Sequence, residues 1–359
     1  MTEQTTPQGA PNPAVTLRDL GWKSHFQHQL AEDDALNGLR PVRVTAVHRS
    51  GLHVTGPGID ADIAPFFDPD LDEAANATIG DWLLLDPETL VARHMLERAS
   101  LFKRRAPGTG REVQLIAANV DTVFIVTSCN EDFNIARLER YLTLARQAQV
   151  TPVLVLTKPD LATDPEAYVE HAQALDRSMC VELVNATTEA GAKRLLPWCG
   201  RGQTVVFVGS SGVGKSTLVQ TLTGRAGIET QAIREDDAKG RHTTTRRDLY
   251  QLESGAWLVD TPGMRELSLA DVKEGLDVVF ADLADLEQHC RFKDCAHDAE
   301  PGCAVKAAVA RGEIDPARVA RWQKLVAEDA LNALSLVERR AKDRALSRMI
   351  KSVKKGKQG

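Results

Sequence analysis

The sequence contains no run of eighteen apolar residues, so it predicts no transmembrane helix. The first thirteen residues are polar and rich in proline, and they lack the basic start and the apolar stretch of a secretory signal. We therefore expect a cytoplasmic protein that makes no membrane contact. With 43% apolar and 26% charged residues, a chain of 359 residues is long enough for two or three globular domains.

Cysteine is scarce, and the spacing of the six cysteines does not suggest a disulfide framework. Three have apolar sequence neighbours and are interpreted as reduced core residues: Cys129, Cys180 and Cys199. The other three flank a histidine in the pattern Cys290-x4-Cys295-x-His297-x5-Cys303. Three thiolates and one imidazole complete a tetrahedral Zn²⁺ site with no position left for water. The pattern therefore predicts one structural zinc ion, the alternative being a chance cluster.

A net charge of −6 argues against nucleic-acid binding over the whole surface. Two segments differ from this average: residues 93–111 carry six Arg or Lys against one Glu, and residues 335–359 carry nine against two acids. Local basic segments on an acidic chain indicate a specific polyanionic partner. The alternative is that neither segment binds a partner: residues 93–111 would form a solvent-exposed surface, and residues 335–359 a disordered tail.

A glycine-rich segment matches the phosphate-loop pattern G-x-x-x-x-G-K-[ST] at every fixed position. It consists of Gly209, Ser210, Ser211, Gly212, Val213, Gly214, Lys215, Ser216 and Thr217. A β-branched apolar run precedes it at 203–208 and a helical pattern follows at 218–222, which is the context that this motif requires. We expect Lys215 to reach the β- and γ-phosphates of a nucleotide and Ser216 to hold Mg²⁺.

Two further motifs narrow the nucleotide to GTP. Residues 260–263 have the form D-x-x-G at a strand end, so we expect Asp260 to act on Mg²⁺ and the Gly263 N–H to face the γ-phosphate. Thr157, Lys158, Pro159 and Asp160 have the form [NT]-K-x-D, also at a strand end. The Asp160 carboxylate can accept from guanine N1–H and the 2-amino group, which adenine does not offer, while Lys158 packs along the base. The alternative for this motif is an ordinary turn.

The order of these motifs is unusual, because the base-recognition motif at 157–160 precedes the phosphate loop at 209–217. The same sheet can be built with the chain cut at another loop, so the order predicts a circularly permuted GTPase domain. The loop after Gly263 then leads directly into the C-terminal domain. A change in this loop between the GTP and GDP states can therefore be relayed to the zinc domain.

The catalytic group is the least determined part of the site. A threonine between the phosphate loop and Asp260 is expected on Mg²⁺, with Thr244 and Thr245 both favoured. Met264 occupies the place where Ras-type sites carry a water-orienting Gln, and His242 is the nearest polar candidate in sequence. A site without that Gln should be slow alone, so we expect an activating partner.

The strand and helix patterns divide the chain into four parts. We expect an N-terminal extension at 1–39, a β-barrel at 40–112 built from short strands, a GTPase domain at 113–280 and a helical zinc domain with a basic tail at 281–359. An OB-type barrel fits the first strands, and alternating strands and helices predict an α/β parallel, doubly wound sheet in the GTPase domain. Nothing indicates a coiled coil, and we expect a monomer.

Over nearly its whole length the sequence resembles the ribosome small-subunit-dependent GTPase A family (RsgA, also called YjeQ). The matching stretches include the three nucleotide motifs, the cysteine cluster and residues 20–22, 80–82, 100–104, 118–121 and 240–245. The resemblance implies an OB barrel, a permuted GTPase domain and a zinc domain. It also implies late maturation of the small ribosomal subunit, contact with its rRNA, and stimulation of GTP hydrolysis by the subunit.

The resemblance also bears on two groups of site residues. It favours His242 as the residue that orients the attacking water. It places a second base-contacting motif, Ser-Ala, at Asn185 and Ala186, where this chain has asparagine in place of serine.

Two other functions share the phosphate loop. A small-molecule kinase would show no guanine preference and no D-x-x-G switch, so comparing GTP with ATP affinity separates it from a GTPase. A nucleotide-gated binding module without turnover is compatible with Met264, and hydrolysis assays with and without small subunits separate it.

Overall fold

The computed structural model describes residues 15–32, 36–48, 50–66, 76–105, 113–176, 179–223, 247–260 and 272–330. The chain forms two compact units. The first comprises the described parts of residues 1–102, 115–133 and 149–266, and the second those of residues 103–114, 134–148 and 267–359. Within the described ranges, every helix is too short or too polar to cross a membrane.

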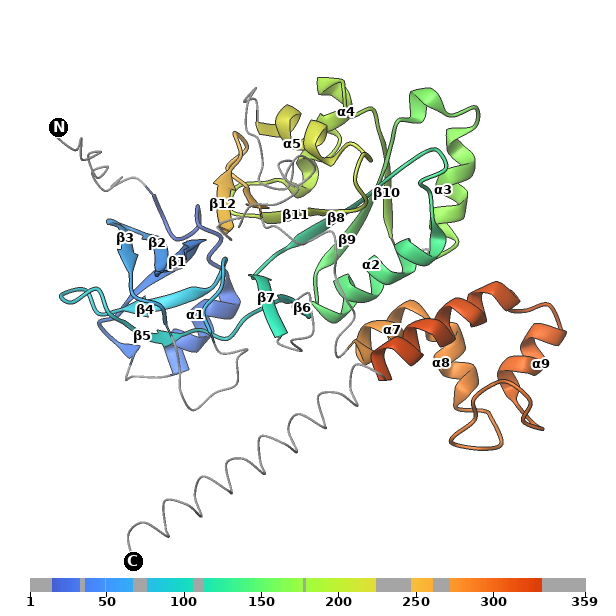
Figure 1. Ribbon diagram of the computed structural model, residues 1–359. Helices are drawn as coiled ribbons and strands as arrows, with labels where there is room; N and C mark the ends of the chain where they lie inside the picture. Colours follow the sequence, from blue (N-terminus) through green and yellow to red (C-terminus); the bar gives the residue numbers. More distant parts are fainter. Residues whose placement is uncertain are drawn as a thin grey trace, which may run out of the picture. The chain divides into compact units, whose positions relative to one another are not determined.

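One mixed sheet runs through the first unit in the order β10-β9-β8-β11-β13-β12-β1-β2-β3, with β4 added to β1 and β5 to β4 (Figure 1). Its N-terminal strands are β1 (Arg40–Val47), β2 (Leu52–Gly56), β3 (Ile59–Ile63), β4 (Trp82–Leu85) and β5 (Ala92–Met95). Its later strands are β8 (Thr122–Ser128), β9 (Thr151–Thr157), β10 (Cys180–Val184), β11 (Thr204–Val208), β12 (Arg247–Gln251) and β13 (Trp257–Asp260). A separate two-stranded sheet pairs β6 (Leu101–Arg105) with β7 (Val113–Ala118).

The strands from β10 to β13 form the α/β part of the sheet. Strands β8 and β11 are buried along their whole length, as expected of parallel strands whose sequences are continuous apolar runs. Segments α3 (Pro165–Gln173), α4 (Glu189–Lys193) and α5 (Lys215–Thr223) connect or follow them, with α1 (Ser24–Glu32) at the N-terminal end of the unit.

The prediction of a wholly parallel sheet is wrong at β12. This strand pairs antiparallel with β13, because only a tight turn closed by Leu252 N–H to Ala256 O at 2.8 Å separates them. On its other edge β12 pairs antiparallel with β1, through Ala46↔Asp248 and Val47↔Arg247. The N-terminal strands and the strands from β10 to β13 therefore belong to one continuous sheet, which the sequence patterns did not predict.

A buried arginine connects the N-terminal strands to the start of β11. Arg43 is 1% exposed, and its guanidinium donates to Leu20 O at 2.6 Å and to Thr204 Oγ1 at 2.7 Å. Next to it, Trp257 Nε1 donates to Asp19 O at 2.7 Å, and the Asp19 carboxylate accepts from Arg201. We call this set (Asp19, Leu20, Arg43, Arg201, Thr204 and Trp257) the seam.

Two glycines allow close contact between backbone segments at the seam. Gly21 and Gly202 have φ of +89° and +77°, and a Cβ on Gly202 would lie 2.4 Å from Arg18 O. A Cβ on Gly21 would lie 2.6 Å from Gly202 O. Because neither backbone position accommodates a side chain, the N-terminal segment approaches the turn before β11 more closely than other residues would permit.

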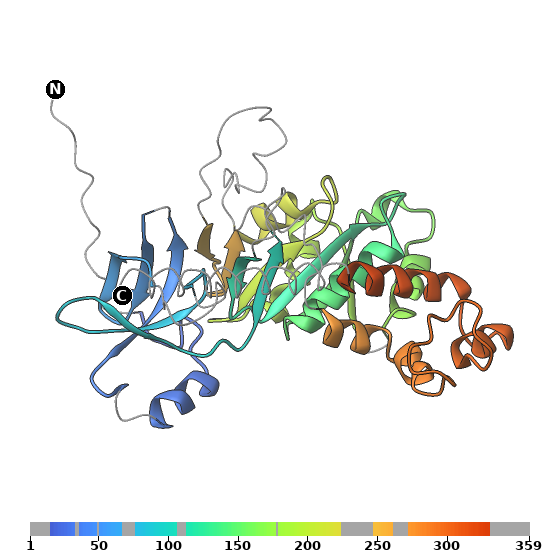
Figure 2. The ribbon, with the colours of Figure 1, turned by 60° about the horizontal axis from the view of Figure 1, so that its bottom comes forward.

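The second unit is helical. It contains α2 (Ile135–Gln147), α7 (Lys273–Val279), α8 (Ala281–Glu287), α9 (Ala304–Ala310) and a helix at 316–330. The orange and red helices of this unit gather together in both views (Figures 1 and 2). Gly275 allows α7 to approach α2, since a Cβ there would lie 2.2 Å from Thr143 O.

A buried carboxylate is paired with two arginines within this helical unit. Glu139 of α2 is fully buried and accepts from Arg321 Nε at 2.7 Å and from Arg318 Nη1 at 3.3 Å. Two arginines therefore offset the cost of removing one carboxylate from water. Although α2 lies between β8 and β9 in sequence, its packing places it with the C-terminal helices.

Candidate functional site

The loops that follow β9, β10 and β11 meet at one edge of the sheet. These strands are parallel to their neighbours, so their carboxyl ends lie on the same side. A Cβ placed on Gly214 of the phosphate loop would lie 3.7 Å from Ala186 Cβ and 3.8 Å from Thr157 Cβ. The structure thus brings together the base-recognition motif, the loop after β10 and the phosphate loop.

The phosphate loop has the backbone conformation that its glycines predict. Gly209, Gly212 and Gly214 have φ of +141°, +77° and +97°. A Cβ on Gly209 would lie 2.1 Å from Val126 O, so this position excludes any other residue. Helix α5 begins at Lys215, which places Ser216 and Thr217 in its first turn. Such a loop at a helix N-terminus can surround phosphate oxygens with N–H groups.

Side chains of the base-recognition motif tie it to the phosphate loop. Thr157 Oγ1 donates to Val213 O at 2.6 Å, and Lys158 Nζ donates to Gly212 O at 2.8 Å. Lys158 has a left-handed backbone, with φ of +57°, and is followed by a 3-10 turn, η3 (Pro159–Leu161). Asp160 lies on this turn with an exposed side chain. The carboxylate is therefore accessible to a base at the edge of the site.

The phosphate-loop lysine is held by the backbone of its own loop. Lys215 Nζ donates to Gly209 O at 2.9 Å and also to Ser210 O. These carbonyls hold the ammonium group over the loop, the place from which it can reach phosphate oxygens.

The switch residues are only partly described. Asp260 ends β13, which is the parallel neighbour of β11, so its backbone lies at the same edge as the phosphate loop. The other predicted residues of this group, His242, Thr244, Thr245 and Gly263, lie outside the described residues, as does Met264. Their assigned roles stay predictions.

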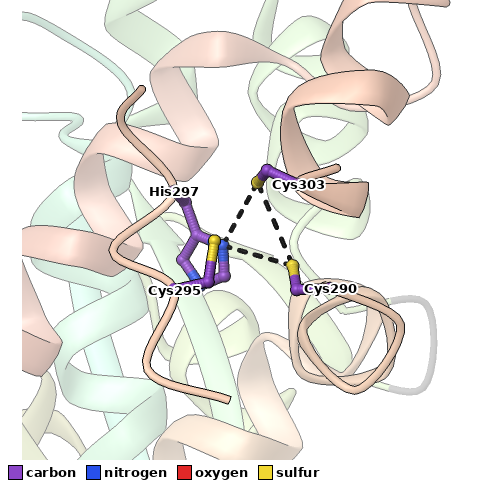
Figure 3. A group of neighbouring side chains, drawn as sticks. All are labelled: Cys290, Cys295, His297 and Cys303. Carbon is purple, nitrogen blue, oxygen red and sulfur yellow. Dashed lines mark hydrogen bonds between the residues drawn. The ribbon is translucent and has the colours of Figure 1, made fainter. Parts of the chain in front are cut away.

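Four side chains of the second unit form a compact donor cluster (Figure 3). Their ligand atoms, the Sγ atoms of Cys290, Cys295 and Cys303 and a ring nitrogen of His297, all lie within 4.8 Å of one another. The Cys290 and Cys303 sulfurs are 3.9 Å apart, and His297 Nδ1 lies 3.6 Å and 3.5 Å from them. Tetrahedral zinc with ordinary bond lengths requires about 3.8 Å between sulfurs and about 3.6 Å from sulfur to nitrogen. The cluster therefore has the dimensions of a zinc site.

The groups around the cluster favour a bound cation. Ala304 N–H donates to Cys290 Sγ and Lys306 N–H to Cys303 Sγ, both at 3.4 Å. Burial opposes ionisation, but backbone N–H groups of residues 304 and 305 hold the pKa of Cys290 below its ordinary value. His297 Nε2, the ring nitrogen turned away from the sulfurs, lies 3.5 Å from Glu287 Oε1. This nitrogen is buried and makes no hydrogen bond within the described residues, so Glu287 lies near the histidine without fixing the orientation of its ring.

Sequence patterns did not reveal two groups of residues. Glu287 precedes the cluster by three positions on α8, a spacing that carried no signal because acidic residues are common on helix surfaces. The seam was also missed, since no local pattern connects Arg43 with Thr204, which lies 161 residues later.

A family model described as RsgA GTPase matches residues 95–270. The small ribosomal subunit biogenesis GTPase RsgA of Mesorhizobium japonicum is 50% identical over 88% of this chain and 91% of its own length. The chain belongs to the RsgA GTPase family. RsgA 2 of Vibrio vulnificus, with the same description, is 46% identical over 96% of both chains.

Membership of the RsgA family confirms the resemblance predicted from the motifs, and it makes the chain a GTP hydrolase. A second family model, ABC transporter, matches residues 198–358. This span includes the phosphate loop, which many nucleotide-binding proteins share, but not the base-recognition motif at 157–160. The second match therefore adds nothing beyond nucleotide binding.

Solved structures support the permuted fold. The crystal structure of YjeQ from Thermotoga maritima matches with a TM-score of 0.58 and 25% identity, over 81% of this chain and 98% of that chain. YloQ, described as a circularly permuted GTPase, matches with a TM-score of 0.56 and 23% identity, over 82% and 96% of the two chains. The similarity to YloQ concerns the fold alone, and it agrees with the motif order of this RsgA-family chain.

Proposed function

We propose that this RsgA-family GTPase acts in late maturation of the small ribosomal subunit, as a monomer in the cytoplasm. In this proposal it binds the subunit through rRNA, and the subunit stimulates hydrolysis of GTP to GDP and phosphate. The observation that carries the proposal is the meeting of the loops after β9, β10 and β11 around Gly214. The name of the relatives supplies the process, since they match 88% and 96% of the chain.

Each part of the site has a role in this proposal. Residues 209–217 bind the phosphates, and Asp160 with Lys158 recognises guanine, with Asn185 and Ala186 beside them. Ser216, Asp260 and either Thr244 or Thr245 hold Mg²⁺, which would neutralise charge on the β- and γ-phosphates. The Gly263 N–H faces the γ-phosphate and makes the following loop responsive to it.

We assign the orientation of the attacking water to His242, because Met264 cannot serve in place of a glutamine. Ras alone is slow even with its glutamine, and its activator accelerates it about 10⁵-fold. A site without that group needs a partner, and the small subunit fills this role in the proposal.

The domain boundaries predicted from sequence are kept in this proposal: an extension at 1–39, an OB-type barrel at 40–112, the GTPase domain at 113–280 and a zinc domain at 281–359. Strand order β3-β2-β1-β4-β5 supports the barrel, because β1 pairs with both β2 and β4, a non-consecutive pairing that fits the five-stranded Greek-key barrel of the OB type. The sulfur and nitrogen spacing of the cluster supports zinc. The zinc ion would stabilise the fold around it rather than take part in catalysis.

Hydrolysis measured with and without purified small subunits tests the function. We expect slow turnover of GTP alone and a large stimulation by subunits, and an absence of stimulation would contradict the proposal. Binding to subunits should weaken steeply between about 50 and 200 mM salt if rRNA phosphates are contacted. Flat binding over this range would rule out the rRNA contact.

Two variants test the ligands. Asp160→Asn should shift preference from GTP toward the xanthosine nucleotide, because the amide can donate to a 2-oxo group. Cys295→Ser should lower the zinc content of the purified protein measured by mass spectrometry. Cys180→Ser should not, because Cys180 lies outside the cluster and is exposed, so its prediction as a core residue is wrong. Equal zinc content in both variants would contradict the assigned metal site.

A further inference from the structure

The histidine of the cysteine cluster lacks the usual support of a metal ligand within the described residues. His297 Nδ1 lies 3.6 Å from Cys290 Sγ and 3.5 Å from Cys303 Sγ, so this nitrogen is the one available to a metal (Figure 3). Metal-binding histidines almost always donate their other ring N–H to a carboxylate, a carbonyl or water, which fixes the ring. Here that nitrogen, Nε2, is buried without a hydrogen bond to any described residue. The orientation of the ring must therefore be fixed in another way.

The ring of His297 packs on a tryptophan of the C-terminal helix at 316–330. The ring centroids of His297 and Trp322 are 5.2 Å apart, and their planes are inclined by 40°. Trp322 is 6% exposed and the His297 side chain is 4% exposed, so both rings are removed from water. A closely packed interior leaves little space for another side-chain rotamer. The indole can therefore keep Nδ1 directed at the two sulfurs.

The helix that carries Trp322 is itself fixed on both sides of this residue. Arg321 Nε donates to the buried carboxylate of Glu139 on α2 at 2.7 Å. Gln323 Nε2 donates to the carbonyl of Ala296, the residue before the histidine, at 3.0 Å. A residue can position a ligand only if its own location is fixed by its surroundings. The two hydrogen bonds give Trp322 such a location.

One carboxylate holds the backbone on both sides of the histidine. Glu300 Oε1 accepts from the Ala296 N–H at 2.9 Å, and Oε2 accepts from the N–H groups of Asp298 at 3.0 Å and Ala299 at 3.1 Å. Between them His297 has φ of +61°, a left-handed conformation that is uncommon for a residue with a side chain. Hydrogen bonds to an ionised carboxylate are stronger than those between neutral groups, so they offset the cost of this conformation. Glu300 thus fixes the main chain from which the imidazole extends.

We propose that Trp322 and Glu300 are the positioning residues of the metal site. The indole holds the imidazole ring of His297, and the carboxylate holds its main chain. This inference rests on the proposed zinc site. A ligand that is already held in its binding conformation loses less conformational entropy when the metal binds. Both residues should therefore increase the affinity for zinc, although neither is one of its ligands.

The test measures the affinity of the full chain for Zn²⁺, by transfer of zinc from the purified protein to a chelator of known affinity. We expect Trp322→Leu to raise the dissociation constant about 10- to 100-fold, the range found when residues that support metal ligands are changed. Trp322→Phe should retain most of the affinity, because an aromatic ring still packs on the imidazole. Glu300→Ala should raise the dissociation constant about tenfold.

The visible spectrum of the protein produced with Co²⁺ in place of Zn²⁺ reports on the imidazole itself. The absorption bands of Co²⁺ depend on its ligands and their geometry. Trp322→Leu and Glu300→Ala should change the position and intensity of these bands, since water replaces the imidazole in part of the molecules. Trp322→Phe should keep the spectrum of the unmodified chain.

Three controls separate this effect from others. Trp198→Leu removes a tryptophan that packs on the ring of Phe124 in the first unit. Glu313→Ala removes an exposed glutamate of the second unit that pairs with Arg311. Both variants should keep the zinc affinity and the cobalt spectrum. Glu287→Ala should change them little, because the Glu287 carboxylate is near the histidine ring without a hydrogen bond to it.

The inference is overturned if Trp322→Leu or Glu300→Ala lowers the thermal unfolding temperature but keeps the zinc affinity and the cobalt spectrum, since a purely structural residue would act in that way. If Trp322→Leu does not fold, Glu300→Ala decides by the same two measurements. A loss of zinc affinity in Glu287→Ala as large as in Trp322→Leu also overturns it. An unmodified chain that holds no zinc contradicts the proposed metal site itself.

Discussion

The two ends of strand β11 differ in the residues that surround them: distant residues surround its start, and consecutive residues follow its end. At its start, Thr204 accepts a hydrogen bond from buried Arg43, and the surrounding groups come from residues 19 to 257. At its end, Gly209 opens a loop whose residues are consecutive in sequence and whose partners are mostly backbone carbonyls. The first arrangement holds the N-terminal strands to the sheet, and the second forms the glycine loop that leads into the N-terminus of α5. The comparison predicts that changes at the seam act on stability, whereas changes at the phosphate loop act on nucleotide chemistry.

Lys215→Ala gives the largest expected effect and tests the loop end of β11. Loss of the ammonium group should lower kcat/KM for GTP by about 10²- to 10³-fold, because it removes a charge aimed at the reacting phosphates. The thermal unfolding temperature should change little. Lys193→Ala, which removes a largely exposed lysine of α4, is the matched control and should leave kcat/KM unchanged.

Arg43→Met tests the seam end of the same strand. The variant leaves the carbonyl of Leu20 and the hydroxyl of Thr204 without their buried donor, so the free energy of unfolding should fall by about 3 kcal/mol. Urea unfolding followed by tryptophan fluorescence measures this. Arg40→Met, at the exposed start of β1, should have a small effect. If folded Arg43→Met loses GTP affinity as strongly as Lys215→Ala, the two ends of β11 are not separate in function.

A glycine-to-alanine substitution can be made next to each end of β11. Gly202→Ala and Gly209→Ala each place a Cβ against a backbone oxygen at a positive φ, and each should cost about 2 kcal/mol of stability. Only Gly209→Ala should also weaken GTP binding, measured by titration. Gly58→Ala is the control for backbone strain alone, because φ there is +73° and a Cβ would meet no atom within 4 Å. Equal loss of GTP affinity in both variants would contradict the comparison.

The seam should also respond to acid. The hydrogen bond from Arg201, with those from Thr16, lowers the pKa of Asp19 to about 2. A carboxyl whose pKa is lowered by folding stabilises the protein above the unfolded value, and this stabilisation is lost as the pH falls from about 5 toward 2. Because the Arg201 side chain is 67% exposed, solvent screening makes this contribution small. Asp19→Asn should remove this part of the acid dependence in unfolding curves measured at several pH values, and an unchanged curve would show that the pair contributes nothing.

The difference between the two ends of β11, one built from distant residues and the other from consecutive ones, also explains which features could be predicted from sequence. The phosphate loop, Asp160 and the cysteine cluster were identified because each depends on residue types at short, fixed spacings. The buried strand β11 was predicted because a continuous apolar run precedes the phosphate loop, and such runs indicate parallel strands. In each of these cases the information lies within a few consecutive residues.

Features that depend on distant residues could not be predicted. Nothing near Arg43 in sequence distinguishes it from a surface arginine on a strand, and its partners became apparent only with the fold. The antiparallel pairing of β12 with β1 has the same origin, since alternation patterns do not name the partner of an edge strand. The loop after β10 is an intermediate case. The sequence shows asparagine in place of serine at Asn185, but only the structure shows that Asn185 Oδ1 accepts hydrogen bonds from the Thr187 N–H and hydroxyl.

The pairing of β1 with β12 has a consequence for synthesis of the chain. Residue 248 leaves the ribosome about two hundred residues after residue 46, which at ordinary rates of about 5 to 20 residues per second is a delay of about 10 to 40 s. Strand β4 pairs with residues 40–43 of β1, and β12 pairs with Ala46 and Val47. Until β12 has been synthesised, Ala46 and Val47 therefore lack the strand with which they pair in the folded protein. An open edge of this kind is a site for wrong pairing between chains. The N-terminal strands of a nascent chain therefore complete their sheet only after nearly the whole first unit has been translated.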